Sequence, residues 1–258
     1  MRKTLKIIGC FAASACLAAA GLPSVGYALS KHNNEAVMKL YRKAKKDRTG
    51  KWMAHRGYSA LAPENTEAAF LLAAMCGAKA IETDVHCSSD GYPFLMHWSH
   101  MNRMTNSPSS ALIETFSQKS VRNLWIAKGK NVHMFRKMRV CPLDKYLDVC
   151  RRYGCFARIE LKADSALHKN ARLRDRLTAN VLNEIRKAGM TKRCLVASFH
   201  KDMLVSFRKN DPRKTVPLRL QASDLHGVTQ AEASRFNASE NLRIPVEILA
   251  ARSGDAPA

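Results

Sequence analysis

Beyond residue 50, short apolar runs alternate with longer stretches in which apolar residues recur at helical spacing. The apolar runs predict strands at Lys51–Arg56, Ala78–His86, Tyr92–Trp98, Phe156–Leu161, Cys194–Phe199 and Val216–Leu220. The helical spacing predicts helices from Asn65 or Thr66 to Gly77, and at Leu143–Tyr153, Ala171–Lys187 and Asp202–Lys209. A strand, a helix and a second strand in succession favour parallel pairing through a right-handed crossover.

Repeated units of this kind predict an α/β fold, and more specifically a TIM-type (β/α)8 barrel over residues 51–258. Residues 99–140 interrupt the pattern with polar clusters and basic runs, so we expect an inserted loop region over the barrel mouth and no separate domain. Among the later residues only Ile244–Ala250 has the pattern of a strand. We therefore expect the barrel to be short of its last one or two strands, with exposed edges.

The first 28 residues have a different organisation from the rest of the chain. A basic stretch, Met1–Lys6, precedes the apolar stretch Ile7–Leu22, and small, turn-prone residues follow up to Ala28. This order predicts an export signal and a secreted, periplasmic or cell-surface protein. An uncleaved membrane anchor is the alternative, although a spanning helix needs about 20 apolar residues. Residues 29–50 then predict a basic amphipathic helix outside the barrel.

The composition combines an ordinary apolar fraction with an excess of positive charge. The chain of 258 residues is 46 % hydrophobic and carries a formal net charge of +22. Such a field attracts anionic partners, whether phospholipid head groups, wall polymers or nucleic acid; the alternative is a solvated basic surface without a partner. Six of the 8 cysteines follow the predicted signal, and none of them forms a CxxC pair. This spacing argues against a zinc site, while export would permit disulfides.

Carboxylates gather on two of the predicted strands. Glu82 and Asp84 share one face of their strand, and Glu160 lies with Lys162 on one face of another. Two buried carboxylates on one face repel each other unless a cation lies between them. Three of them from two strands favour magnesium or calcium over zinc. The simpler alternative is that Glu160 and Lys162 form an ion pair with each other.

Two histidines and an arginine follow predicted strands. His55 and His97 each close one, which in a barrel is the rim where reacting groups lie. Phosphodiester cleavage needs a base for the nucleophile and an acid for the departing alkoxide, and imidazole serves as either near neutral pH. Arg56 offers a planar, two-pronged donor to a phosphate oxygen. Surface positions for these side chains are the alternative. His86 shares the face of Glu82 and Asp84.

The motifs that follow one another from Met53 to Leu220 are His55-Arg56-Gly57, Pro63-Glu64-Asn65-Thr66, Glu82-x-Asp84, Asp90-Gly91, His97, Glu160-x-Lys162 and Ser198-Phe199. In order and spacing they resemble those of the glycerophosphodiester phosphodiesterase family. The resemblance implies Mg²⁺ or Ca²⁺ on Glu82, Asp84 and Glu160, acid/base catalysis by His55 and His97, and phosphate contacts from Arg56 and Lys162. It further implies hydrolysis of a glycerophosphodiester to glycerol 3-phosphate and an alcohol, in glycerol and lipid metabolism, with no specific nucleic-acid partner.

The chain departs from the family pattern at two places. Trp98 stands where the family usually has aspartate after the second histidine, and the closing Trp-Thr-x-Asn and Gly-x-Asp motifs are absent before Ala258. Three alternatives therefore stay open. The protein could be a non-catalytic anion-binding derivative of the fold, for lipid or wall polymer, or a truncated inactive chain. It could also be a related barrel phospholipase acting on intact lipids.

Overall fold

The computed structural model describes residues 29–44, 46, 52–163, 167, 169–240 and 253–254. The predicted export signal, the predicted strand Ile244–Ala250 and the end of the predicted N-terminal helix lie outside these residues. Within them, no helix combines the length and the apolar character that crossing a bilayer requires.

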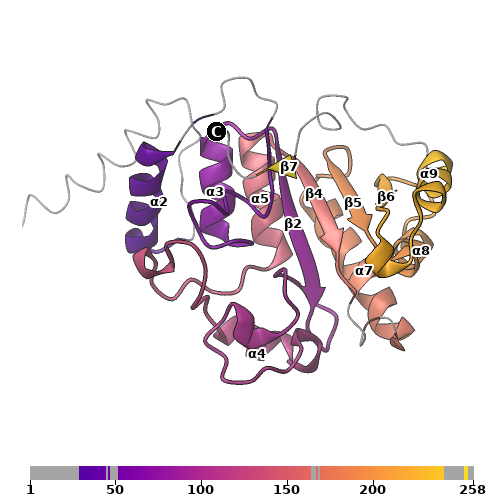
Figure 1. Ribbon diagram of the computed structural model, residues 1–258, viewed down its shortest axis with the longest axis horizontal. Helices are drawn as coiled ribbons and strands as arrows, with labels where there is room; N and C mark the ends of the chain where they lie inside the picture. The colour runs from indigo at the N-terminus through magenta and orange to yellow at the C-terminus, as the bar shows by residue number, and fades with distance from the viewer. Residues whose placement is uncertain are drawn as a thin grey trace, which may run out of the picture.

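Seven strands form one sheet in the described part of the chain (Figure 1). Their bounds are β1 (Met53–Ala54), β2 (Ala80–Cys87), β3 (Pro93–Leu95), β4 (Phe156–Leu161), β5 (Cys194–Ser198), β6 (Leu218–Leu220) and β7 (Ser253–Gly254). Six of them pair in parallel in the order β6-β5-β4-β2-β1-β7, and β3 is antiparallel to β2. The parallel order, with intervening helices, confirms the predicted TIM-type barrel class.

Helices alternate with the parallel strands and cover the outer face of the sheet, except that the first helix precedes β1 and the short helix at Gln118–Asn123 belongs to the inserted segment (Figure 1). They are α2 (Lys31–Lys43), α3 (Glu67–Met75), α4 (Gln118–Asn123), α5 (Leu143–Tyr153), α7 (Ala171–Lys187), α8 (Lys201–Asn210) and α9 (Gln230–Ser239). Thr66 caps α3 as predicted, because its Oγ1 accepts a hydrogen bond from the Ala69 N–H. Gly154, in the left-handed region, ends α5.

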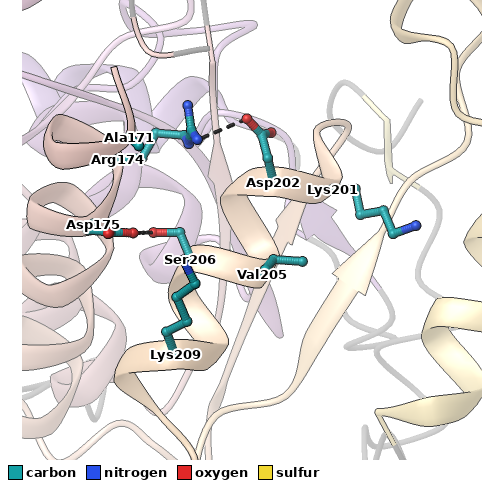
Figure 2. Close-up of a pocket in the computed structure, with 8 residues that line it drawn as sticks. All are labelled: Ala171, Arg174, Asp175, Lys201, Asp202, Val205, Ser206 and Lys209. Carbon is teal, nitrogen blue, oxygen red and sulfur yellow. Dashed lines mark hydrogen bonds and ion pairs between the residues drawn. The ribbon is translucent and has the colours of Figure 1, made fainter. Parts of the chain in front are cut away.

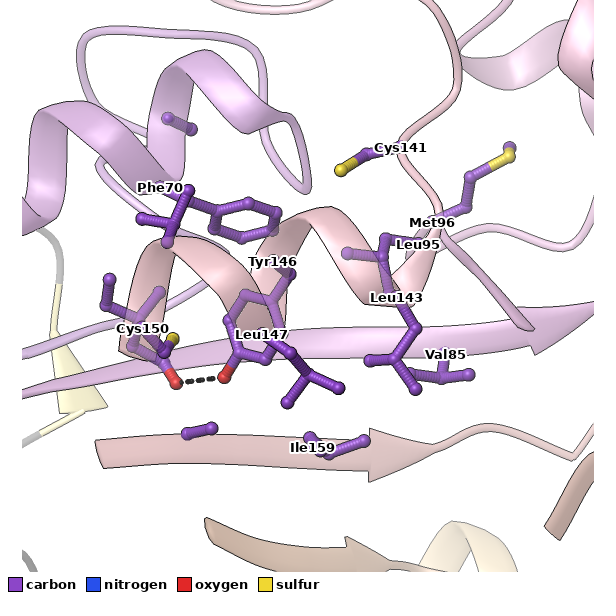
Figure 3. Close-up of a cluster of buried hydrophobic side chains, with 14 of the residues drawn as sticks. Phe70, Val85, Leu95, Met96, Cys141, Leu143, Tyr146, Leu147, Cys150 and Ile159 are labelled. Atoms are coloured by element: carbon purple, nitrogen blue, oxygen red, sulfur yellow. Dashed lines mark hydrogen bonds between the residues drawn. The ribbon is translucent and has the colours of Figure 1, made fainter. Parts of the chain in front are cut away.

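The main core lies between the sheet and these helices (Figure 3). Phe70 of α3 meets Tyr146 of α5 edge to face, with ring centroids 4.9 Å apart. The buried Tyr146 hydroxyl donates to the Ile81 carbonyl of β2 at 2.6 Å, which removes the cost of burying it. Because side chains alternate along a strand, Ile81 faces this core while Glu82 faces the barrel interior.

A small second cluster fills the interior at the amino-terminal ends of the strands. Met53, Ala80, Phe156 and Leu195, one from each of four adjacent strands, pack together there. Glu82 and Asp84 follow Ala80 on the same face of β2, so this apolar layer forms the floor beneath the carboxylates. The alternation of β2 thus gives apolar residues to the outer core and charge to the interior.

The predicted bounds of α5, β4 and α7 are confirmed to the residue, and those of most other predicted elements shift by one to three residues. Other differences are larger. The helix predicted within residues 29–50 ends at Lys43. The strand predicted at Tyr92–Trp98 is only Pro93–Leu95, and it returns antiparallel beside β2 through the Asp90-Gly91 turn instead of joining the barrel. The helices α4 and α9 and the short strand β7 were not predicted.

The inserted segment packs onto the same core as the barrel. Its buried side chains include Met101, Ile113, Val121 and Ile126. The amide of Asn33 in α2 donates to the Arg136 carbonyl at 3.1 Å, which links the N-terminal helix to this segment. The six cysteines of the described residues are all buried and free, and burial raises the pKa of the Cys141 and Cys150 thiols well above their usual value.

Candidate functional site

Three carboxylates from two adjacent strands meet in the barrel interior. Asp84 of β2 and Glu160 of β4 are register partners, and Glu82 lies two residues before Asp84 on the same face. Glu82, Asp84 and Glu160 are 3 %, 1 % and 8 % exposed. Each offers a ligand oxygen within 4.8 Å of the others. The structure thus brings together the three residues that the sequence suggested as metal ligands.

The electrostatics of this cluster fit a cation. Burial, followed by the charges of Asp84 and Glu160, raises the pKa of Glu82 well above its usual value. Glu82 Oε1 is buried and has no hydrogen-bond partner among the described residues. A hard divalent ion satisfies such an oxygen and relieves the repulsion among the carboxylates, so the three residues could hold one.

Arg56 follows β1 with a positive φ of 57°, and this conformation turns its backbone into the site. Its N–H donates to Glu82 Oε2 at 2.9 Å, and its guanidinium lies 3.2 Å from Asp84 Oδ2 and 3.1 Å from Glu64 Oε2. The next residue must be glycine, since a Cβ on Gly57 would lie 2.7 Å from the Ala69 backbone. The His-Arg-Gly sequence therefore reflects a turn that aims both the main chain and the side chain of Arg56.

Asn65 also holds Asp84 in place through hydrogen bonds. With a φ of 55°, it donates from Nδ2 to Asp84 Oδ2 at 2.9 Å. Its Oδ1 accepts from the Asp84 N–H at 3.1 Å and from the Thr83 hydroxyl at 2.8 Å. All of these groups are buried. From the sequence, Asn65 was expected only to begin a helix and to belong to the Pro63-Glu64-Asn65-Thr66 motif, and its contact with Asp84 was not predicted.

Lys162 lies just beyond β4 and joins two of the carboxylates. Its Nζ is 3.0 Å from Asp84 Oδ1 and 2.5 Å from Glu160 Oε1. Burial by itself would lower the pKa of Lys162, but these two carboxylates raise it above its usual value. Burial alone would also raise the pKa of Asp84, but Lys162 and Arg56 hold it below its usual value. The simple Glu160–Lys162 pair therefore exists, but inside a larger network.

The two candidate catalytic histidines have different surroundings. The His55 side chain is 42 % exposed and has its Nε2 3.9 Å from Glu82 Oε2. His97 lies beyond β3, not at the carboxyl end of a barrel strand, so its predicted equivalence to His55 is wrong. A backbone hydrogen bond from Met96 to the Asp84 carbonyl, 3.1 Å long, still brings this loop to the site. Burial, opposed by Asp84, lowers the pKa of His97 to about 4.

A buried pair of side chains supports the His97 loop. His86, on the site face of β2, lies with its Nδ1 3.3 Å from Glu114 Oε1 and its Nε2 3.3 Å from the His97 carbonyl. Glu114 comes from the inserted segment, and both side chains are buried. This link between the insertion and His97 was not predicted, since nothing in the sequence pairs Glu114 with His86.

The chain matches a known family over most of its length. The family model described as the glycerophosphoryl diester phosphodiesterase family matches residues 55–247 of this chain. The chain belongs to this family. That membership confirms the resemblance drawn from the motifs, and the match spans all the candidate residues, from His55 to Lys162.

Several curated glycerophosphodiester phosphodiesterases and related enzymes match segments of this chain. A glycerophosphoinositol inositolphosphodiesterase of Homo sapiens is 54 % identical over 57 residues, which are 22 % of this chain and 11 % of the relative. Glycerophosphodiester phosphodiesterase 1 of Mus musculus is 30 % identical over 162 residues, 62 % of this chain and 46 % of the relative. The chain thus spans only about a tenth to a half of the length of these curated relatives.

Solved structures of the family share the fold. A glycerophosphodiester phosphodiesterase from Agrobacterium tumefaciens is 28 % identical, with a TM-score of 0.53 over 64 % of each chain. A phosphodiesterase from Oleispira antarctica, solved with the product sn-glycerol-3-phosphate, is 24 % identical, with a TM-score of 0.58 over 77 % of this chain and 73 % of that one.

A separate hollow of about 370 Å³ lies between α7 and α8 (Figure 2). None of the carboxylates described above lines it. Its polar side chains pair across the two helices, Arg174 with Asp202 at 3.4 Å and Ser206 with Asp175. The hollow is therefore a seam between neighbouring helices of the barrel wall, and the chemistry is concentrated at the carboxylates.

Proposed function

We propose that this protein is an exported, metal-dependent phosphodiesterase that hydrolyses glycerophosphodiesters to glycerol 3-phosphate and an alcohol. The observation that carries the proposal is the buried triad Glu82, Asp84 and Glu160, with an unpartnered Glu82 oxygen and with Arg56 and Lys162 beside it. Membership of the family supports the same chemistry. The proposal includes a role in glycerol and lipid metabolism and an exported location. It also includes association with an anionic membrane or wall surface.

The triad would hold Mg²⁺ or Ca²⁺, which supplies charge stabilisation at phosphate oxygens. Arg56 and Lys162 add fixed positive charge where negative charge builds up on the phosphate. One of the two histidines removes the proton of the attacking hydroxyl, and the other gives a proton to the departing alkoxide as the P–O bond breaks. The attacking hydroxyl is either that of water or the 2-hydroxyl of the glycerol moiety, in which case water then opens a cyclic phosphate.

The test uses the purified protein with glycerophosphocholine, after chelation and with Mg²⁺ or Ca²⁺ restored. We expect release of glycerol 3-phosphate that depends on the metal, and loss of at least about a hundredfold in kcat for His55→Ala and for His97→Ala. Lys209→Gln changes an exposed side chain of α8 that lines the separate hollow and not the carboxylate site, so this control should retain full activity. Full turnover in either histidine variant would show that its role is misassigned.

Two further substrates separate the alternatives. Intact phosphatidylcholine replaces the deacylated substrate to test for a phospholipase, and faster cleavage of the intact lipid would overturn the proposal. Cyclic glycerol phosphate tests the two-step route, which requires that the enzyme open the ring at least as fast as it turns over the diester. No hydrolysis with any metal would instead favour a non-catalytic anion-binding protein.

A further inference from the structure

The inserted segment has an unusual distribution of charge. Between Tyr92 and Leu143 the only carboxylate is Glu114, which is buried. Eight cationic side chains in this segment are all exposed, and we call them the basic collar: Arg103, Lys119, Arg122, Lys128, Lys130, Arg136, Lys137 and Arg139. None of the eight forms an ion pair with a carboxylate among the described residues. The preceding residues 52–91 are the opposite, with five acidic and two basic side chains.

The basic collar lies beside the catalytic site. In Figure 1 the inserted segment, with α4, lies beyond the carboxyl end of β2. The guanidinium of Arg103 stacks 4.6 Å from the ring of Trp98, the residue after His97. Lys128 and Lys130 flank Gly129, where an added Cβ would lie 2.9 Å from Cβ of Pro63 in the loop before Glu64. Both ends of the site are therefore bordered by unpaired positive charge.

Trp98 adds an aromatic contact to this charge. It is 44 % exposed, although indole is among the more strongly buried side chains in proteins. An exposed tryptophan next to basic residues is typical of protein surfaces that lie in the head-group region of a bilayer, where the ring is half solvated. Arg103 on one face of the indole places a cation at the same depth.

We propose that the basic collar and Trp98 dock the protein on an anionic phospholipid surface, with the mouth of the site facing the bilayer. The benefit of this orientation rests on the proposed function, because it would bring the site close to the place where lipid breakdown releases phosphodiesters. The cations come from several short loops and from α4, and not from one continuous row. Laterally mobile head groups can meet cations so dispersed, whereas the regular phosphates of a nucleic acid favour a continuous row.

The experiment measures binding of the full chain to sedimented vesicles of equimolar phosphatidylcholine and phosphatidylglycerol. Vesicles of phosphatidylcholine alone give the background from the apolar residues 7–22. The collar variant carries Lys119→Gln, Lys128→Gln, Lys130→Gln and Arg136→Gln. The matched control changes four exposed cations of the barrel wall by Arg172→Gln, Lys192→Gln, Lys209→Gln and Arg213→Gln. Each cation near an anionic bilayer contributes roughly fivefold to binding, so the collar variant should bind about a hundredfold or more weakly, and the control close to wild type.

A second measurement follows the indole itself. The chain has three tryptophans, of which Trp52 is buried and Trp125 is partly buried, so the shift is measured in a Trp125→Phe background. Tryptophan emission should shift to the blue on anionic vesicles, and the shift should disappear when Trp98→Phe is added. Equal losses in the collar and control variants would overturn the proposal and leave a general basic surface. Tighter binding to soluble polyphosphate or DNA than to vesicles, with no change in Trp98 emission, would overturn it in favour of a polymer.

The outcome is separable from that of the proposed function. Turnover of soluble glycerophosphocholine is measured on the same proteins at high salt, where the docking interaction is screened. The collar variant should keep this turnover, because none of its four residues belongs to the carboxylate site. Specific vesicle binding without any turnover would uphold docking and refute the proposed activity; turnover without specific binding would do the reverse.

Discussion

Asn65 offers the sharpest test of how the site is built. Replacing Asn65 with glycine removes three buried hydrogen bonds, two at Asp84 and one at Thr83, while the new residue still accepts the positive φ of 55°. Each bond contributes about 1 kcal/mol, and the Asp84 N–H and Thr83 hydroxyl are left buried without this partner. We expect a loss of about 3 kcal/mol in the free energy of unfolding.

Replacing Asn65 with alanine separates the backbone from the side chain. It removes the same hydrogen bonds but also forces a Cβ into the left-handed region, which costs about 1 kcal/mol more. We therefore expect a total loss of about 4 kcal/mol. Urea denaturation followed by circular dichroism gives both free energies of unfolding. In a thermal denaturation, the midpoint temperature of a chain of this size should fall by roughly 2–4 °C for each kcal/mol lost. Unfolding free energies within 0.5 kcal/mol of wild type for Asn65→Gly would refute the reasoning.

The remaining predictions concern charge at three places. Lys162→Met should lower kcat about a hundredfold, since a fixed cation at the phosphate is lost, while calorimetry should show metal affinity unchanged or tighter because Lys162 no longer neutralises Asp84 and Glu160; weaker metal binding would contradict this. Glu114→Ala should lower kcat about tenfold with little change in KM, because His86 loses the partner that steadies the His97 loop, and Glu114→Gln should restore most of it; equal rates in wild type and both variants would contradict the positioning role. Asp211→Asn should cost roughly 3 kcal/mol at pH 7, since Asp211 is fully buried and meets Arg186 and Arg208. Burial would raise the pKa of Asp211, but hydrogen bonds from Thr215 and Val216 hold it below its usual value, so this stabilisation is present above the unfolded pKa of about 3.9 and is lost as pH falls below it. The difference in the free energy of unfolding between wild type and Asp211→Asn should become smaller from pH 5 downwards. A difference that stays constant with pH would refute the assignment.

The local elements could be predicted closely where the apolar pattern and the end signals agree. α5 has an apolar stripe that ends at Gly154, and β4 alternates between the outer core and the interior, so both were predicted to the residue. The same alternation placed Glu82 and Asp84 on one face, and the register of β2 with β4 then brings Glu160 beside them. The metal-binding candidates therefore followed from strand parity.

The contacts that depend on the folding back of loops could not be predicted from the pattern. Asp90-Gly91 is itself a hairpin signal, but the apolar residues after it suggested one more barrel strand. Glu114 meets His86 only because the inserted segment returns over β2, and no spacing in the sequence encodes that contact. Arg56 and Asn65 both have positive φ values; asparagine adopts this region more often than most residue types, but nothing in the sequence indicates it for Arg56.

The central claim is that Glu82, Asp84 and Glu160 form a divalent-metal site on which phosphodiester hydrolysis depends. Calorimetric titration of the metal-free protein with Mg²⁺ or Ca²⁺, paired with glycerol 3-phosphate release from glycerophosphocholine, tests it most directly in the wild type and in Glu82→Gln. The account predicts one bound ion per chain in the wild type, at least tenfold weaker binding in Glu82→Gln, and a parallel loss of product release. Unchanged metal affinity in Glu82→Gln, or full hydrolysis in the presence of a chelator, would contradict it.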